Sequence, residues 1–290
     1  MKAAEPAIIS KDATVLGFRI HYLEAGRGDR VILLHGMGGE GARWMPTIRG
    51  LTSQFRVIAP DQIGFGASDK PLTTYHRGVF AGFLVGFMKA IAVPRATLIA
   101  QSMGVGVALY VAVHHARMVA RLVLVNGAGL GMDGPPPAQP DWHARQIANA
   151  GTLEESREYL EKIYYDRSLI TDSLVEQNLV LRLRSAFTIE SMQTANARGL
   201  GRLTEEELRE IGIPTLLVWG INDPLSPIQI ADKLHGAIKA SRKVLIEKAG
   251  HFPFLEHPQQ FNQTVLEFLK NEHQTDAMPR TMAREPRATR

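Results

Sequence analysis

The sequence predicts an α/β protein with a mostly parallel central sheet, helices on both faces and an inserted helical lid. Short apolar runs alternate with longer helical patterns over the first 126 residues, as in parallel sheets whose strands are joined by helices. Several of these runs are continuously apolar, which is typical of strands covered on both faces. After Asn126 the alternation stops, and it resumes near residue 210.

The first two strands are expected as an antiparallel hairpin around Gly17, over residues 14–18 and 19–23. The later strands are short and apolar, and we expect them at Val31–Leu34, Arg56–Ala59, Ala96–Ala100, Leu122–Val125, Thr215–Trp219 and Lys243–Ile246. The helices between and after them are expected at Trp44–Leu51, Tyr75–Ile91, Val105–His115, Pro227–Ile238 and Pro258–Lys270. Pro227 and Pro258 suit the first helical position, where a missing N–H costs nothing.

These elements predict four parts of the chain. Residues 1–126 and 210–272 form the core, residues 127–209 form the helical lid, and residues 273–290 form a flexible tail. Within the lid, Thr152 and Glu155 have the spacing of a capping box, and Thr171 is expected to cap a further helix.

Composition excludes several classes of protein. The chain has 290 residues, 45% of them hydrophobic, no cysteine and a net charge of +4. Disulfides and thiolate metal sites are therefore excluded, and no basic stripe suggests nucleic-acid binding. No apolar run approaches the roughly 18 residues of a membrane span, and charged residues interrupt any signal peptide. We expect a cytoplasmic protein with no cofactor and no metal; a homodimer remains open.

The stretch Leu98–Gly106 carries the clearest chemical signal. An apolar strand leads into Ser102, and a helical run of small residues leads away from it. This is the context of a nucleophile elbow, whose sharp turn exposes a serine hydroxyl above the sheet. Gly104 and Gly106 supply the small residues behind the serine, whereas Ala100 replaces the glycine usual ahead of it. A serine after a strand is also commonly a helix cap, so the presence of partner residues elsewhere in the chain decides between a cap and a nucleophile.

A serine hydroxyl needs a base that takes its proton and an acid that orients the base. Asp223 directly follows an expected strand, and His251 lies one short loop after the last strand. Taken alone, Asp223 could be a turn residue and His251 a packing residue. The chain order Ser, Asp, His at strand ends is known from a large class of hydrolases. We therefore predict a triad of Ser102, Asp223 and His251.

Acyl transfer also needs donors for the oxyanion of its intermediate. One is expected to be the backbone N–H of Met103, and the other that of Met37 or Gly38 in the loop after Val31–Leu34. This loop could instead hold a phosphate, but no Lys-Ser or Lys-Thr follows it and the G-x-G-x-x-G spacing is absent. His35 is expected to brace the loop.

On these residues the chain resembles the α/β-hydrolase fold enzymes over Thr14–Glu272. The segment Tyr164–Val175 resembles the lid of the meta-cleavage product hydrolases, which cut a carbon–carbon bond in vinylogous 1,5-diketone acids; carboxylesterases are also similar. Haloalkane dehalogenases and epoxide hydrolases use an aspartate nucleophile, whereas position 102 is serine. Lactonases and perhydrolases of this fold remain open.

Two residues depart from the carbon–carbon hydrolases. Where that family has an arginine for the substrate carboxylate this chain has Asn178, although Arg182 and Arg184 lie close by, and Phe252 replaces a tryptophan after the histidine. Both changes suggest a less charged substrate. Besides Asn178 and Phe252, the residues expected to line a pocket under the lid are Trp142, Phe187, Met192 and Leu200, with lid packing as the alternative for each.

The sequence hypothesis is a cofactor-free serine hydrolase that cleaves a small or medium carboxylic ester through an acyl-enzyme. The first alternative keeps the triad but cuts a carbon–carbon bond of a ketone substrate, in a 2-hydroxy-6-oxo-dienoate. The second alternative is a binding protein that senses a small ligand with a vestigial triad.

Overall fold

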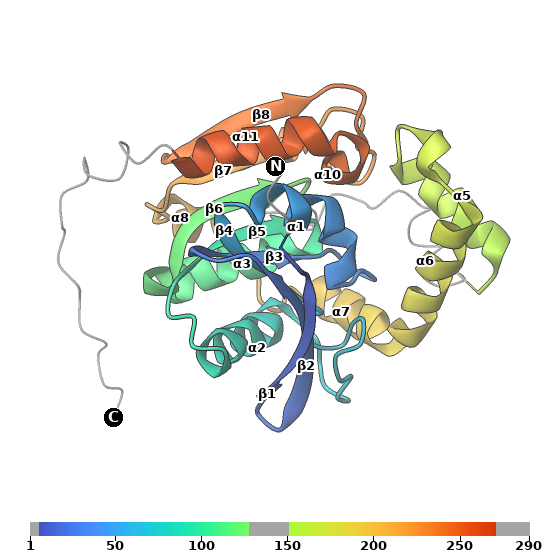
Figure 1. The fold of residues 1–290 in the computed structure, drawn as a ribbon, viewed down its shortest axis with the longest axis horizontal. Helices are drawn as coiled ribbons and strands as arrows, with labels where there is room; N and C mark the ends of the chain where they lie inside the picture. The colour runs from blue at the N-terminus through green and yellow to red at the C-terminus, as the bar shows by residue number, and fades with distance from the viewer. Residues whose placement is uncertain (1–5, 128–150, 271–290) are drawn as a thin grey trace.

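A computed structural model describes residues 6–127 and 151–270, and the chain folds around one eight-stranded sheet (Figure 1). The strand order is β1-β2-β4-β3-β5-β6-β7-β8. β1 pairs antiparallel with β2, β2 pairs antiparallel with β4, and all later pairs are parallel. The predicted mostly parallel sheet is confirmed.

The strands are β1 (Ile9–Val15), β2 (Phe18–Ala25), β3 (Asp29–Leu34), β4 (Phe55–Pro60), β5 (Ala96–Gln101), β6 (Val119–Val125), β7 (Thr215–Gly220) and β8 (Ser241–Ile246). The helices of the core are α1 (Met45–Leu51), α2 (Arg77–Ala90), α3 (Met103–His114), α9 (Ile228–Ala237), α10 (Pro253–Glu256) and α11 (Pro258–Lys270). Between β6 and β7 lie the inserted helices α5 (Leu153–Ile163), α6 (Asp172–Arg184), α7 (Ala186–Ala197) and α8 (Glu205–Arg209), with the 3-10 turn η3 (Arg167–Leu169) after α5.

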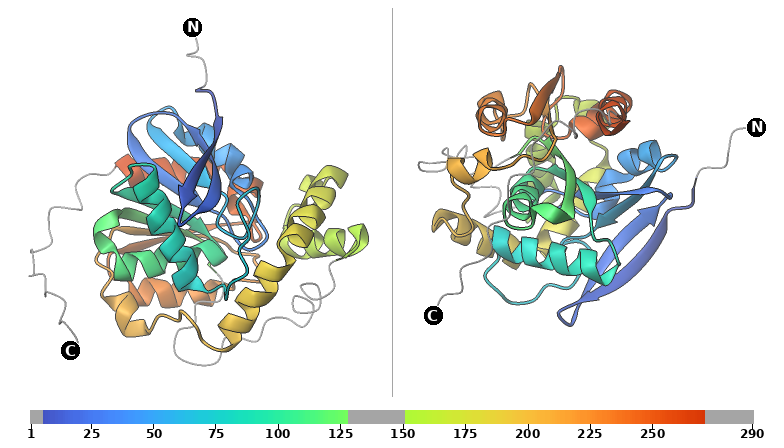
Figure 2. Two further views of the ribbon diagram at one scale, coloured as in Figure 1. Left: turned by 90° about the horizontal axis from the view of Figure 1, so that it is seen from below. Right: turned by 90° about the vertical axis from the view of Figure 1, so that its left-hand side faces the viewer.

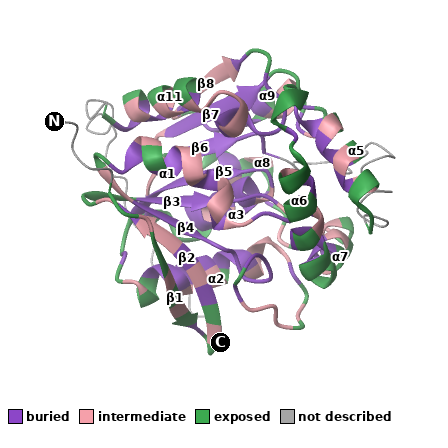
Figure 3. Cartoon of the chain, turned by 45° about the vertical axis from the view of Figure 1, so that its right-hand side comes forward, coloured by how far each residue is buried: buried purple, intermediate pink, exposed green. Residues whose placement is uncertain are grey.

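Two hydrophobic clusters cover the two faces of the sheet. One joins α2, α3, α8 and α9 to the sheet, and the other joins α1, α10, α11 and the inner side of α5. The strands β5 and β7 are buried along their whole length, whereas α6 exposes one side to solvent (Figure 3). The continuous apolar runs of the sequence reflect this double coverage.

The inserted helices α5–α7 lie to one side of the core (Figure 2, left). Two of their sequence signals are confirmed: Thr152 and Glu155 form a reciprocal capping box, and Thr171 accepts a hydrogen bond from the N–H of Leu174. The strand order of the sheet reverses at β3, because the next strand, β4, lies on one side of β3 and the following strand, β5, lies on the other. Ligands of open α/β sheets bind at such a reversal, beyond the carboxyl ends of the strands.

Three expectations about the elements need correction. The hairpin turns at Leu16 and Gly17, both at positive φ, so Phe18 opens the second strand instead of closing the first. Pro227 is the N-cap of α9 and lies just outside it, and α10 between His251 and α11 was not expected. The predicted tail and Trp142 lie outside the described residues.

Candidate active site

Ser102 occupies the turn between β5 and α3. Its backbone has φ 53° and ψ −119°, a conformation that non-glycine residues rarely adopt. Strain of this kind persists only where the surrounding structure enforces it, and it is common at active sites. The serine is 8% exposed. The sequence prediction of a sharp strand–turn–helix at this residue agrees with this geometry.

Close packing around the turn explains its glycines. A Cβ on Gly104 would lie 2.7 Å from the carbonyl oxygen of Leu34, so α3 can approach β3 only with glycine there. A Cβ on Gly36 would lie 2.9 Å from the Cβ of Ser102. The loop after β3 therefore touches the serine. Ala100, which replaces the usual glycine, is fully buried in β5.

Asp223 and His251 meet beyond the ends of β7 and β8. Nδ1 of His251 lies 2.7 Å from Oδ2 of Asp223, and both side chains are almost fully buried. Burial by itself would raise the pKa of the Asp223 carboxyl. The nearby His251, its hydrogen bond and the donors Asn126 and Leu225 outweigh burial and hold that pKa below its ordinary value. An ionised Asp223 fixes the histidine tautomer that leaves Nε2 free to accept a proton.

Asn126 is a third group in this arrangement, and sequence reasoning missed its role. Its Nδ2 donates to Oδ2 of Asp223 over 2.6 Å, and its Oδ1 accepts from the N–H of Gly220 over 3.0 Å. The residue is fully buried and has φ 43°, a left-handed conformation that asparagine tolerates better than most residues. It holds the same carboxylate oxygen that contacts His251.

The loop after β3 is braced as predicted for His35. Nδ1 of His35 lies 2.7 Å from the carbonyl oxygen of Gly36, and Nε2 accepts from the N–H of Gln62 over 3.0 Å. Burial lowers the pKa of His35 to about 4. The imidazole is therefore neutral near pH 7, as an accepting Nε2 requires.

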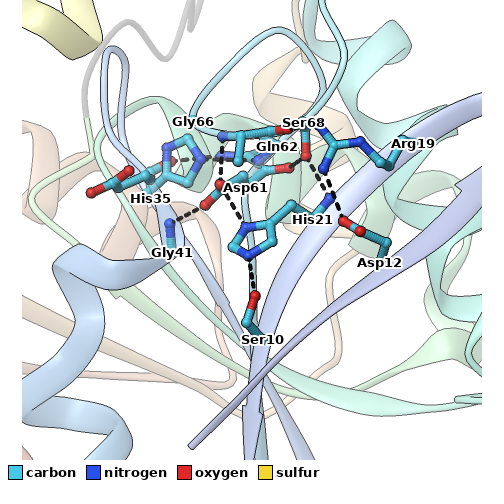
Figure 4. Close-up of polar contacts among 12 residues, drawn as sticks. Ser10, Asp12, Arg19, His21, His35, Gly41, Asp61, Gln62, Gly66 and Ser68 are labelled. Atoms are coloured by element: carbon cyan, nitrogen blue, oxygen red, sulfur yellow. Dashed lines mark hydrogen bonds and ion pairs between the residues drawn. The ribbon is translucent and has the colours of Figure 1, made fainter.

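A buried carboxylate braces the neighbouring loop (Figure 4). Oδ1 of Asp61 accepts from the N–H of Gly41, while its Oδ2 accepts from the N–H of Ala67 and contacts Nδ1 of His21. Nε2 of His21 lies 2.8 Å from the hydroxyl of Ser10 on β1. This network connects the β1–β2 hairpin to the loop after β4.

The candidate oxyanion donors come from the start of α3 and from the loop after β3. Met103 is the first residue of α3, where backbone N–H groups have no partner within the helix. Met37 and Gly38 follow Gly36 in the loop that touches Ser102. Gly38 has φ 68°, and a Cβ there would approach Arg182.

The predicted pocket residues separate in the structure. Phe252 is buried, with its ring 5.2 Å from that of His251. Met192 is buried in the cluster that includes α2 and α3. Asn178 is buried between α5 and α6, where its Nδ2 donates to the hydroxyl of Ser156. Phe187 is 48% exposed and lines a surface groove of about 270 Å³ together with Leu200.

Of the two arginines that follow Asn178, Arg182 is buried near the site. It is 6% exposed, its side chain reaches Gly38, and its guanidinium lies 4.3 Å from the centre of the Tyr159 ring. Its Nη2 is buried without a hydrogen-bond partner among the described residues. A buried guanidinium donor without a hydrogen-bond partner is costly, so Nη2 requires a partner from outside the described residues.

Within the described residues, none of the helices combines the length and the apolar character needed to cross a membrane. The same residues contain no group of three or more acidic or histidine side chains placed to hold a metal ion.

This fold and this site define the class. A family model described as the alpha/beta hydrolase fold matches residues 29–258. The chain belongs to that family and is a hydrolase of this fold. It is 32% identical to a 2-hydroxy-6-oxo-6-(2'-aminophenyl)hexa-2,4-dienoic acid hydrolase of Metapseudomonas resinovorans, over 92% of each chain.

Other relatives give the same picture. The chain is 30% identical to a 2-hydroxy-6-oxo-6-phenylhexa-2,4-dienoate hydrolase of Burkholderia cepacia, over 88% of this chain and 92% of that one. The solved structure of a meta-cleavage product hydrolase from Pseudomonas fluorescens IP01 superposes with a TM-score of 0.80 at 28% identity, covering 89% of this chain and 97% of that one. The resemblance to carbon–carbon bond hydrolases is confirmed, whereas these relatives do not support the expected ester substrate.

Proposed function

We propose that this protein is a serine hydrolase that cleaves a carbon–carbon bond in 2-hydroxy-6-oxo-dienoate acids. Similarity over nearly the whole chain to relatives named for such substrates supports the reaction class. The observation that carries the proposal within this chain is the buried Nη2 of Arg182, which lies near the loop after β3 and has no hydrogen-bond partner among the described residues. A simple ester has no group that needs it, whereas a dienoate has a carboxylate.

The proposed chemistry uses the triad in a serine hydrolase cycle. His251 takes the proton of Ser102 as the serine oxygen adds to the ketone carbonyl, while the N–H groups of Met103 and Met37 hold the oxyanion. The substrate reacts as its 2-oxo tautomer, in which the proton of the 2-hydroxyl has moved to C5. When the C5–C6 bond breaks, the electron pair passes into the 2-oxo-3-ene system as a dienolate, and His251 returns its proton to this fragment, which leaves as a 2-hydroxy-dienoate. Water then hydrolyses the acyl ester, so one water is consumed and two acids are formed. Asp223 orients His251 throughout.

Arg182 gives this substrate its anchor in place of the arginine that Asn178 replaces. The two positions are four residues apart, so Arg182 lies one helical turn along the same side of α6. The Asn178 amide is already bound to Ser156. A guanidinium can bind a carboxylate through two parallel N–H···O bonds, which fixes the orientation of the acid as well as its affinity. The helices α5–α7 act as the lid that carries this anchor.

The test compares Arg182→Met with Arg184→Met, because Arg184 is on the same helix but exposed. A charge-assisted pair contributes about 1.5–3 kcal/mol. Arg182→Met should therefore raise KM for a ring-fission dienoate by roughly 10- to 100-fold and leave the turnover of a neutral p-nitrophenyl ester nearly unchanged. Arg184→Met should change neither. Equal KM values for the dienoate in wild type and Arg182→Met would contradict the assignment.

A second candidate is the ester hydrolase predicted from the sequence. It is favoured by Phe252 and Asn178, since both positions lack the polar groups of the carbon–carbon hydrolases and Asn178 is bound inside the lid. Wild-type protein that turns over the p-nitrophenyl ester quickly and leaves the dienoate intact would establish this candidate. Tight dienoate binding without turnover of either compound would instead support a ligand sensor.

A further inference from the structure

The end of α5 is attached to the loop that carries His251. The N–H of His251 donates to the carbonyl oxygen of Ile163 over 2.8 Å. A Cβ on Gly250 would lie 2.3 Å from that same carbonyl oxygen, so the two backbones are in direct contact. The ring of Tyr164 lies 5.0 Å from that of Phe252. The first residues after α5 thus follow the histidine loop closely.

One carboxylate joins these two segments. Oε1 of Glu256 accepts from the N–H of Gly250 over 2.8 Å. Its Oε2 accepts from the N–H groups of Tyr165 and Asp166, over 2.8 and 3.0 Å. The carboxylate therefore connects the residue before the candidate base to two consecutive residues of the inserted segment.

The contact requires a side chain that accepts hydrogen bonds at both of its polar atoms. Burial raises the pKa of the Glu256 carboxyl above its ordinary value, and the hydrogen bonds from backbone N–H groups offset only part of this rise. A carboxylate can accept at both oxygens, whereas an amide of the same shape has one acceptor and one donor group. Since all three facing groups are donors, only a carboxylate satisfies both sides of the contact.

We propose that Glu256 is a positioning residue for His251, and that it acts by fastening the lid segment 163–166 to the histidine loop. The position of the base is then set by the lid as well as by Asp223. Any movement that opens the lid must either keep residues 163–166 fixed or displace His251. We infer that opening occurs beyond η3, in α6 and α7, and leaves the end of α5 in place.

The first test is Glu256→Gln, with Glu267→Gln as its control, because Glu267 is exposed on α11 and bonds only to the nearby Gln263 among the contacts of the described residues. Misplacing a catalytic group by about 1 Å can cost on the order of 10²-fold in rate. Glu256→Gln should lower kcat by roughly that factor with KM little changed, since the residue acts on the base and not on bound substrate. Glu267→Gln should match wild type.

Hydrogen exchange supplies a readout that does not depend on turnover. In Glu256→Gln the amides of residues 163–166 and 249–252 should exchange faster together, whereas the other lid helices keep their protection. Faster exchange in only one of the two segments, or in neither, would overturn the proposed connection. So would a Glu256→Gln variant with wild-type kcat.

Gly250→Ala disturbs the same contact from the other side and leaves Glu256 intact. Its Cβ would displace Ile163, so it should reproduce the loss of kcat and the paired increase in exchange. If Glu256→Gln does not fold, Gly250→Ala tests the connection between residues 163–166 and the histidine loop in its place. A wild-type kcat in Gly250→Ala would overturn the proposal. The inference rests on the proposed role of His251 as base. An inactive wild-type enzyme would refute that role, while the exchange experiment would still test the connection.

Discussion

Removal of the Asn126 amide should weaken both the fold and the active site. Asn126→Gly removes the bond to the charged Asp223, worth about 1.5–3 kcal/mol, and the bond from the Gly220 N–H, worth about 0.5–1.5 kcal/mol. Glycine accepts the positive φ without strain but adds a backbone entropy cost of about 0.5–1 kcal/mol. The free energy of unfolding should therefore fall by about 2.5–5.5 kcal/mol.

Urea unfolding followed by circular dichroism measures this change. Asn222→Gly is the control for the entropy cost, because Asn222 is exposed, and it should lose no more than about 1 kcal/mol. Asn126→Gly should also lower kcat, since Oδ2 of Asp223 loses a donor that fixes it beside His251. A loss of stability no larger than that of Asn222→Gly would refute the argument that Asn126 holds the Asp223 carboxylate.

Three further predictions follow from buried groups. Burial lowers the pKa of His35 from 6.5 to about 4, so the neutral imidazole stabilises the fold fully above pH 6.5 and this stabilisation is lost as the pH falls to 4. In urea unfolding, the loss of unfolding free energy between these two pH values should be about 3 kcal/mol larger in wild type than in His35→Gln. An equal loss in both proteins would contradict this prediction. Gly104→Ala should destabilise the protein by about 1–3 kcal/mol in thermal unfolding, because its Cβ would clash with a backbone oxygen. Gly82→Ala, whose Cβ has no neighbour within 4 Å, should be neutral or stabilising. A Gly104→Ala variant more stable than Gly82→Ala would be inconsistent with this packing. Asp61→Ala leaves two backbone N–H groups without their acceptor and should cost about 2–6 kcal/mol, and an unchanged melting temperature would show that the network in Figure 4 is dispensable.

The sheet could be predicted from sequence because its strands are buried on both faces. The expected runs after the hairpin each fall within β3 to β8, since continuous burial leaves a local apolar signal. The hairpin turn was misplaced because Leu16, an apolar residue, adopts a left-handed conformation in the turn beside Gly17. No local pattern indicates that choice.

The candidate triad could be proposed from sequence, because Ser102 directly follows β5, while Asp223 and His251 lie in short loops after β7 and β8. Asn126 and Glu256 were not assigned roles, and Arg182 could not be told from Arg184, for the opposite reason. Their partners lie far away in the chain, as with Asn126 and Asp223, which are 97 residues apart. The contact of Asn178 is of the same kind, since a single sequence does not reveal that its amide bonds to Ser156 between the inserted helices α5 and α6.

Single-turnover kinetics of Ser102→Ala with a 2-hydroxy-6-oxo-dienoate would test the central claim most directly. We predict that the variant binds the dienoate with nearly wild-type affinity, because Arg182 is intact, but forms no product while the wild type consumes the dienoate. Product formation by Ser102→Ala at the wild-type rate would contradict the assignment of Ser102 as the nucleophile. A wild-type enzyme that leaves the dienoate unchanged would contradict the proposed substrate.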